Sequence, residues 1–177
     1  MCICYKSQIK EKGEVNLSNS FAKDIDDMDI KILDLLQKKT QLSNAELSKI
    51  VNLSPPATHA RLKRLEQRGY IDKYIAVLNK EKLNFDLVCI IFINTQTHEI
   101  KQLEEFEETV IAMPQILECL NLTGEFDYML KAILRNREEL QAFIRRLTNL
   151  KSVSKIQTSV TMREIKFTTT LPLLNEE

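Results

Sequence analysis

Two sets of side chains in this sequence have types and spacing that suit the binding of a charged partner. Between residues 49 and 73, six lysines and arginines stand against only two acids, although the 177-residue chain as a whole has no net charge. A local positive excess of this kind favours an anionic partner such as nucleic acid. The second set is the turn Gly-Glu-Phe-Asp at residues 124–127, which places carboxylates beside the backbone N–H groups of a glycine-containing loop.

The cysteines and histidines do not predict a metal site or a disulfide framework. Cys2 and Cys4 lie at the very start of the chain, whereas Cys89 and Cys119 lie inside apolar runs. The only two histidines are far from the terminal cysteine pair, so the close spacing of metal ligands is not met. We expect Cys89 and Cys119 to be buried as small hydrophobic side chains, and we expect neither a metal nor a cofactor.

An enzyme is not indicated either. No histidine lies near a nucleophile, no pair of carboxylates marks a cleft, and a chain with three glycines has no phosphate-binding glycine loop. No apolar run approaches the roughly 20 residues of a membrane span, and the start of the chain lacks the pattern of a secretory signal. We therefore expect a cytoplasmic binding protein that does not enter the membrane.

The basic residues lie on a stretch, residues 44–65, that predicts two helices joined by a tight turn. Apolar residues at helical spacing predict a preceding helix that begins near Asp26 and ends near Lys39. Ser54 followed by proline is typical of an N-cap and the first position of a helix. Gly69 can end that helix, and the alternation over residues 70–77 favours a short strand pair or wing. Together these features predict a winged helix-turn-helix.

The third helix separates into an inner side and an outer side on a helical wheel of about 100° per residue. Thr58, Leu62 and Leu65 share an arc that would pack inward. The candidate DNA-binding residues lie at the start of the helix and on its other sides: Ser54, Pro56, Ala57, His59, Ala60, Arg61, Lys63 and Arg64. Small residues followed by basic ones suit a helix that enters a major groove at its start and meets phosphate further along. An ordinary solvated helix face is the alternative.

The second half of the chain has the order strand, helix, strand, strand, helix, strand. The strands are expected at residues 87–93, 116–123, 128–134 and 153–165, and the helices at residues 98–113 and 136–150. Such a chain forms an antiparallel sheet with both helices on one face, the ferredoxin-like βαββαβ arrangement, so the fold class is α+β. The other face would be apolar and uncovered, which predicts a homodimer formed through it.

These patterns divide the chain into four parts. The predicted domains are a flexible extension at residues 1–23, the winged helix-turn-helix at 24–78, a linker at 79–86 and the ferredoxin-like domain at 87–177.

The turn at residues 124–127 has two interpretations. A free amino acid needs acceptors for its ammonium group and donors for its carboxylate. Glu125 and Asp127 supply acceptors, and the backbone around Gly124 supplies donors. The alternative is a plain hairpin turn between two strands, and the residues alone favour that alternative.

Several short stretches, in this order and at this spacing, resemble the Lrp/AsnC or feast/famine family of bacterial and archaeal transcription regulators over residues 25–174. The stretches are Asp-Ile-Lys-Ile-Leu at 29–33, Asn-Ala-Glu-Leu-Ser at 44–48, Leu-Ser-Pro at 53–55, Arg-Leu-Glu at 64–66, Gly-Tyr-Ile at 69–71, Thr-Gly-Glu-Phe-Asp-Tyr at 123–128 and Glu-Ile-Lys at 164–166. The chain departs from the family pattern in its longer N-terminal extension and in the position of Pro56, since the second proline commonly comes later.

The resemblance implies a sequence-specific regulator that binds double-stranded DNA and responds to a small amino acid, as a homodimer that assembles to an octamer. It reverses the preference for a plain hairpin turn. The effector-binding residues that it implies are Thr123, Gly124, Glu125, Phe126, Asp127 and Tyr128, with Gln157, Thr158, Ser159 and Thr161 of the last strand as second contributors. The alternative function is a protein-interaction or assembly module whose winged helix does not read DNA.

Overall fold

The structure, a computed structural model, describes residues 24–39, 41–96 and 99–174, and these form two compact units. The first unit contains the residues up to Ile75 together with those from Thr169 onward, and the second contains residues 76–168. The extension predicted at residues 1–23 and the helix start predicted at His98 lie outside the described residues. The predicted domain boundaries stay predictions.

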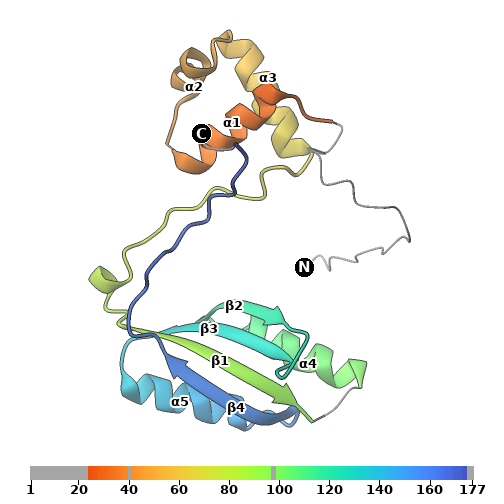
Figure 1. The fold of residues 1–177 in the computed structure, drawn as a ribbon, viewed down its shortest axis with the longest axis vertical. Helices are drawn as coiled ribbons and strands as arrows, with labels where there is room; N and C mark the ends of the chain where they lie inside the picture. The colour runs from red at the N-terminus through yellow and green to blue at the C-terminus, as the bar shows by residue number, and fades with distance from the viewer. Residues whose placement is uncertain (1–23, 40, 97–98, 175–177) are drawn as a thin grey trace. The chain divides into compact units, whose positions relative to one another are not determined.

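The first unit is built from three helices around a small apolar core. Their bounds are α1 Asp27–Lys38, α2 Asn44–Val51 and α3 Pro55–Gln67. Five buried hydrophobic side chains form the core: Ile32, Leu36, Leu47, Val51 and Leu65. The arrangement of α2, a turn and α3 confirms the predicted helix-turn-helix (Figure 1).

Each of these helices begins at a residue whose side chain accepts a hydrogen bond from the first turn. Asp26 caps α1 and Ser43 caps α2, each in a reciprocal capping box, and Ser54 caps α3. Such caps pair N–H groups that would otherwise have no partner inside the helix. Asn52 follows α2 in the left-handed conformation, with φ 55°, and this sharp turn redirects the chain into α3.

The strand pair predicted over residues 70–77 is wrong for this chain. Residues 71–79 have neither helix nor strand, although they are extended in Figure 1. A strand needs a neighbour to complete its hydrogen-bond ladder, and none of the described segments of this chain supplies one. The contact that holds Tyr74 is instead a side-chain hydrogen bond, in which its hydroxyl donates to the Glu66 carboxylate at 2.9 Å.

The second unit contains a four-stranded antiparallel sheet in the order β2-β3-β1-β4. The strands are β1 Leu87–Thr95, β2 Ile116–Asn121, β3 Tyr128–Leu134 and β4 Val153–Val160, and the helices are η1 Glu81–Leu83, α4 Ile100–Ile111 and α5 Arg137–Thr148. Both α4 and α5 lie behind the same face of the sheet in Figure 1. This confirms the βαββαβ arrangement, although β4 ends at Val160, five residues before the predicted end at 165.

The core of the second unit lies between the sheet and its two helices. Its fully or almost fully buried residues come from β1, β3, α4, the turn after α4 and α5: Cys89, Ile91, Ile93, Phe106, Val110, Met113, Tyr128, Leu130, Ala132, Leu134, Phe143 and Leu147. Cys119 is partly buried and packs against them. The prediction of a buried hydrophobic side chain is confirmed for Cys89, whereas Cys119 is buried only in part.

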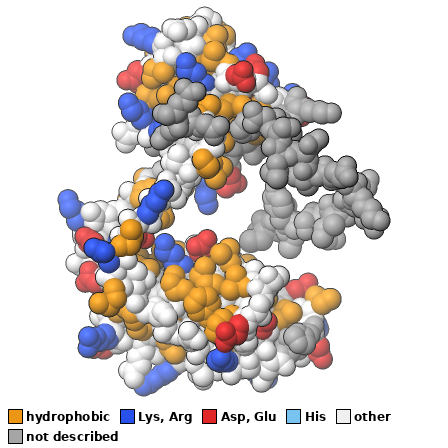
Figure 2. Space-filling view, viewed as in Figure 1, with side chains coloured by type: hydrophobic (Ala, Val, Ile, Leu, Met, Phe, Trp, Pro, Cys, Tyr) orange, Lys and Arg blue, Asp and Glu red, His pale blue; other side chains and the backbone are white. Residues whose placement is uncertain are grey.

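The opposite face of the sheet is apolar along β1, as predicted, but Lys131 of β3 and Gln157 and Ser159 of β4 make part of it polar. In β1 and β3, residues that alternate with the buried ones are half-buried, and in a strand alternate residues point to opposite faces. We call the hydrophobic members the open face: Val88, Ile90, Phe92, Met129 and Ile133, with Leu120 of β2 in register beside Met129. Figure 2 shows hydrophobic side chains gathered over these strands.

The C-terminal segment, residues 169–174, contacts α1 through the side-chain amide of Gln37. Gln37 Nε2 donates to the Leu171 carbonyl at 2.7 Å, and the Leu171 N–H donates to Gln37 Oε1 at 2.9 Å. The amide therefore pairs with both backbone groups of Leu171, much as a neighbouring strand would.

We expect Gln37→Ala to release the C-terminal segment from α1. The substitution removes two hydrogen bonds, each contributing about 1 kcal/mol net, so the Leu171 amide should exchange with solvent roughly tenfold or more faster. Hydrogen exchange measured by NMR tests this, with Lys31→Ala, an exposed change on the same helix, as the control. Equal exchange at Leu171 in wild type and Gln37→Ala would mean that the amide pair does not hold the segment.

Candidate nucleic-acid interface and effector loop

The start of α3 is held by hydrogen bonds within its own first turn and by one hydrogen bond from α2. The Ala57 N–H donates to Ser54 Oγ at 3.4 Å, and Thr58 Oγ1 donates to the Ser54 carbonyl at 3.2 Å. Across the turn, Asn44 Nδ2 of α2 donates to the Pro55 carbonyl at 3.0 Å. These hydrogen bonds fix the position of the first turn of α3 relative to α2. They therefore also fix where the outer side chains of that turn lie on the surface of the unit.

The predicted DNA-binding residues occupy two different sides of α3. Pro56, His59, Ala60 and Lys63 are exposed, whereas Ala57 is half-buried. We call these four exposed residues the outer face of α3. Their spacing of three to four residues places them on one side of the helix, and they include no acid. Lys63 makes no hydrogen bond or ion pair within the described part of the chain.

Arg61 and Arg64 point instead to α1. Arg61 Nη1 donates to both carboxylate oxygens of Asp26, at 2.9 and 2.7 Å, and to Asp29 Oδ1 at 2.9 Å. Arg64 Nη2 donates to Asp29 Oδ2 at 2.6 Å. The Asp29 side chain is fully buried, so these arginines neutralise a charge inside the unit. We call this group of four residues the α1–α3 ion cluster.

The ion cluster shifts the titration of its members. The hydrogen bond from Arg61 holds the pKa of the Asp26 carboxyl below its ordinary value, and the hydrogen bonds to Asp26 and Asp29 raise the pKa of Arg61. A lowered carboxyl pKa stabilises the folded unit above the pKa of the unfolded chain, and this stabilisation is lost as the pH falls through the folded pKa.

The second candidate site is the loop of residues 122–127, which joins β2 to β3. The Leu122 N–H donates to the Asp127 carbonyl at 2.8 Å, and the Asp127 N–H donates to the Ile93 carbonyl at 3.0 Å. Asp127 Oδ2 accepts from the Thr95 N–H at 2.7 Å and from Thr95 Oγ1 at 2.8 Å. Asp127 thus ties the loop to the end of β1.

The middle of the loop is more exposed and is held by weaker contacts. Thr123, Gly124 and Glu125 are exposed, and Gly124 has φ 133°, a backbone region that side chains rarely adopt. Lys155 of β4 lies 3.6 Å from a Glu125 carboxylate oxygen and 5.2 Å from the centre of the Phe126 ring.

The other side of the Phe126 ring meets β1. Its centre lies 5.0 Å from that of Phe92, and Asn94 Nδ2 donates to the Glu125 carbonyl at 2.7 Å. Asn94, Thr95 and Lys155 were not among the residues predicted from the sequence. Asn94 and Thr95 could have been predicted, because they are a polar pair directly after the apolar run of β1. Lys155 could be identified only from the register of β4 against β1.

The remaining predicted effector residues are spread over the sheet. Gln157 lies opposite Phe92 in β1, which places it at the loop end of β4, whereas Ser159 lies opposite Ile90 and the Thr161 N–H donates to the Val88 carbonyl near the other end. Thr158 lies opposite Ile91, on the helix side of the sheet. Within one chain, only Gln157 of these four is therefore near the loop.

Tyr128 belongs to the core rather than to the exposed part of the loop. Its side chain is almost fully buried, and its hydroxyl donates to the Glu107 carboxylate of α4 at 2.8 Å. Burial, followed by the bond to Glu107, raises the pKa of Tyr128. Tyr128 links β3 to α4 and fixes the residue at which the loop ends.

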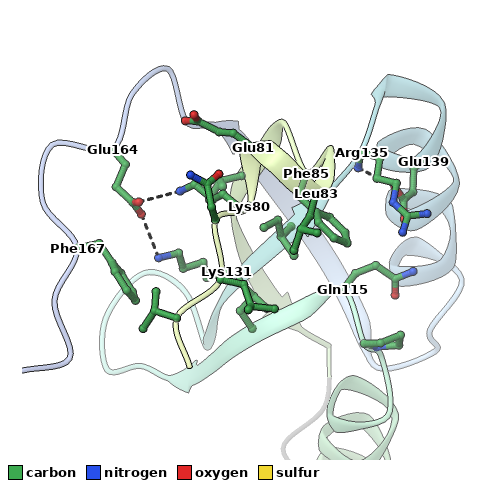
Figure 3. Close-up of a pocket in the computed structure, with 17 residues that line it drawn as sticks. Lys80, Glu81, Leu83, Phe85, Gln115, Lys131, Arg135, Glu139, Glu164 and Phe167 are labelled. Atoms are coloured by element: carbon green, nitrogen blue, oxygen red, sulfur yellow. Dashed lines mark hydrogen bonds and ion pairs between the residues drawn. The ribbon is translucent and has the colours of Figure 1, made fainter. Parts of the chain in front are cut away.

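A hollow of about 720 Å³ opens on the sheet face away from α4 and α5 (Figure 3). Val88 and Ile133 of the open face line it together with Phe85, which follows η1. At its rim, Glu164 accepts a hydrogen bond from Lys80 Nζ at 2.7 Å and lies 3.6 Å from Lys131 Nζ. No residue of this rim was predicted as functional from the sequence.

Neither a metal-binding group nor a membrane-spanning helix is present among the described residues. No group of three or more histidines, cysteines or acids in the described ranges could hold a metal ion. In the same ranges no helix has both the length and the apolar character needed to cross a membrane.

The fold and these two surfaces define a two-domain protein in which a helix-turn-helix is joined to a ligand-binding domain. A model of the Lrp/AsnC ligand-binding domain matches residues 88–171, and a model of a winged helix-turn-helix DNA-binding domain matches residues 25–72. The chain is 39% identical over 152 residues to a leucine-responsive regulatory protein of Haemophilus influenzae, covering 85% of this chain and 92% of that protein. This chain belongs to the Lrp/AsnC family of transcriptional regulators.

Further relatives agree with this assignment. The DNA-binding transcriptional activator DecR of Escherichia coli is 34% identical over 150 residues, with 84% of this chain and 99% of that protein covered. The crystal structure of a transcriptional regulator from Neisseria meningitidis in complex with L-Met matches with a TM-score of 0.81 and 38% identity, over 84% of this chain and 97% of that chain.

We expect acid to destabilise the first unit less in Asp26→Asn than in wild type. The lowered pKa of Asp26 stabilises wild type above the unfolded pKa, and this advantage disappears as the pH falls from about 5 to about 3. Urea denaturation at the two pH values, followed by helix circular dichroism, measures the change. A midpoint that falls equally in both proteins would show that Asp26 does not contribute to the acid sensitivity.

Proposed function

We propose that this transcriptional regulator binds DNA in a sequence-specific manner and that a small amino acid modulates its DNA binding or its assembly. The observation that carries the first half is the outer face of α3, which is exposed, free of acids and set in position by the Ser54 cap. A helix of this kind suits the major groove, where small side chains at its start permit close approach.

On DNA, each residue of the outer face has a distinct part. Pro56 and Ala60 bring the helix backbone close to the groove without a long side chain between them. His59 can donate to or accept from a base edge, and Lys63, one turn further on, suits a phosphate. The specificity of base contacts then depends on His59 more than on the small residues.

The effector site that we propose is the exposed middle of the 122–127 loop. Glu125 is the main acceptor for the ammonium group, because Asp127 Oδ2 already accepts two hydrogen bonds from Thr95. Backbone N–H groups around Gly124 face the carboxylate. The L-Met complex of the Neisseria meningitidis regulator supports an amino acid as the class of ligand.

We further propose that the open face forms a homodimer and that dimers assemble to an octamer. Val88, Ile90, Phe92, Met129 and Ile133 make a contiguous apolar surface, which in a folded protein usually marks a partner site. Gln157, Thr158, Ser159 and Thr161 would then belong to junctions between copies. An effector bound at such a junction would favour one assembly and so alter the spacing of the α3 helices on DNA.

The alternative is a cytoplasmic assembly module whose helix-turn-helix does not read DNA. It would require that the outer face of α3 lack positive charge or be covered. Lys63 remains exposed on that face, and Lys49 is exposed on α2, so the basic excess favours DNA binding.

We expect Lys63→Ala to weaken binding to specific and random duplexes alike, since a phosphate contact carries no sequence information. Removal of one phosphate contact should lower the slope of log affinity against log salt by about 0.9. Fluorescence anisotropy with the DNA upstream of its own gene and a scrambled duplex measures both, with the exposed α4 change Lys101→Ala as the control. Binding by Lys63→Ala that equals wild type on both duplexes would remove Lys63 from the interface.

We expect one or a few of the twenty amino acids to raise the melting temperature, because a ligand bound only to the folded state stabilises it, by about 2.7 kcal/mol at one hundred times the Kd. Glu125→Ala should abolish the rise, whereas Glu104→Ala, an exposed change on α4, should retain it. Differential scanning fluorimetry tests the set. If no amino acid stabilises wild type, the 122–127 loop is a structural turn.

A further inference from the structure

The carboxylate of Asp29 is the buried centre of the first unit. Its side chain is fully buried, yet both of its oxygens have partners: Oδ1 accepts from Arg61 at 2.9 Å, and Oδ2 accepts from Arg64 at 2.6 Å. Oδ2 also lies 3.3 Å from the Asp26 N–H that begins α1. One carboxylate thus joins the start of α1 to two positions of α3.

The arginines of α3 differ from its outer face in what they contact. At about 100° per residue, Lys63 is about 100° from Arg64 and about 160° from Arg61 around the helix axis. Pro56, His59 and Ala60 lie within about 60° of Lys63. Arg64 lies only about 40° from Ala60, but its contacts, like those of Arg61, lead to α1. The ion pairs with Asp29, more than the position around the helix axis, direct the guanidinium groups of Arg61 and Arg64 to α1.

Phosphate would have to compete with Asp29 for these guanidinium groups. If Arg61 and Arg64 turned to DNA, the fully buried Asp29 would lose both charged partners, and an uncompensated buried charge is strongly destabilising. A phosphate contact releases counterions from DNA and is favourable, but an ion pair in solvent stabilises much less than the loss of both partners of a buried carboxylate destabilises. Because breaking the ion pairs with Asp29 costs more than new phosphate contacts gain, both arginines stay paired with Asp29 when the protein is bound to DNA.

We infer that Arg61 and Arg64 are positioning residues that lock α3 onto α1 through Asp26 and Asp29, and that they do not contact DNA directly. This inference rests on the proposed DNA-binding function and replaces the role expected for both arginines from the sequence. The outer face, with Lys63 as its cation, makes the contacts, and the ion cluster sets the angle at which it meets the groove.

The closing experiment compares Arg64→Met with Lys63→Met in the full-length protein. Neighbouring cations on one helix are each replaced by a side chain that keeps an apolar stem. Affinity for a specific and a random duplex is measured by anisotropy over a series of KCl concentrations. We expect Lys63→Met to lower the salt slope by about 0.9 on both duplexes. We expect Arg64→Met to leave the slope unchanged and to weaken specific binding roughly tenfold, with random binding changed less than about twofold.

A double-mutant cycle then asks whether Arg64 acts through Asp29. Asp29→Asn should reproduce the specific loss of Arg64→Met, and the double variant should lose no more than either single change. Asp27→Asn, an exposed change on the same turn of α1 with the same change in charge, should bind as wild type does. Where an Asp29 variant fails to fold, Asp26→Asn, which removes only the half-exposed partner of Arg61, should still show the specific loss with an unchanged slope.

The outcomes separate the two proposals. If wild type binds DNA and Arg64→Met lowers the salt slope as Lys63→Met does, or if the losses in the cycle add, Arg64 contacts phosphate, and the positioning role is overturned while DNA binding stands. If wild type binds neither duplex, the proposed function fails, and the inference fails with it.

Discussion

The buried Asp29 carboxylate is the interaction on which the first unit depends. Five buried hydrophobic side chains, with partly buried ones packed against them, form the core of this unit, and a small domain buries a smaller share of its surface than a large one. Two guanidinium groups that must meet one carboxylate set that angle more narrowly, because charge-assisted hydrogen bonds are short and directional. The same residue takes part in the capping box of α1, so helix initiation and helix packing rest on one side chain.

The second unit depends on a different constraint, which is a sheet covered on one face. Packing against α4 and α5 buries every second residue of β1 and β3, and the alternate residues are left apolar and open. The loop at residues 122–127 is set by this sheet, because Asp127 binds Thr95 at the end of β1 and Phe126 packs on Phe92. The candidate effector loop and the candidate partner surface thus share the strand β1.

Local signals in the sequence were enough to predict the helices and most of the strands, but they did not predict the roles of the charged residues. The caps at Asp26 and Ser54 and the alternation in β1 predict helix starts and a one-sided sheet, since each depends on residues close in sequence. The strand pair over residues 70–77 failed because extended residues need a neighbour, which local pattern cannot supply. Arg61 and Asp29 are 32 residues apart, so only the fold reveals that they are partners.

The arrangement of charge explains why a neutral chain can present a basic surface. Asp26 and Asp29 are paired with two arginines within the first unit, so the charges of these four residues balance one another. What remains there is Lys63, beside small residues and His59. In the proposed function, Lys63 would contribute to the attraction to an anionic partner, whereas Arg61 and Arg64 would set the geometry of contact. A change in one cation could then be made without the other, and such a regulator would have a specificity that is set separately from its affinity.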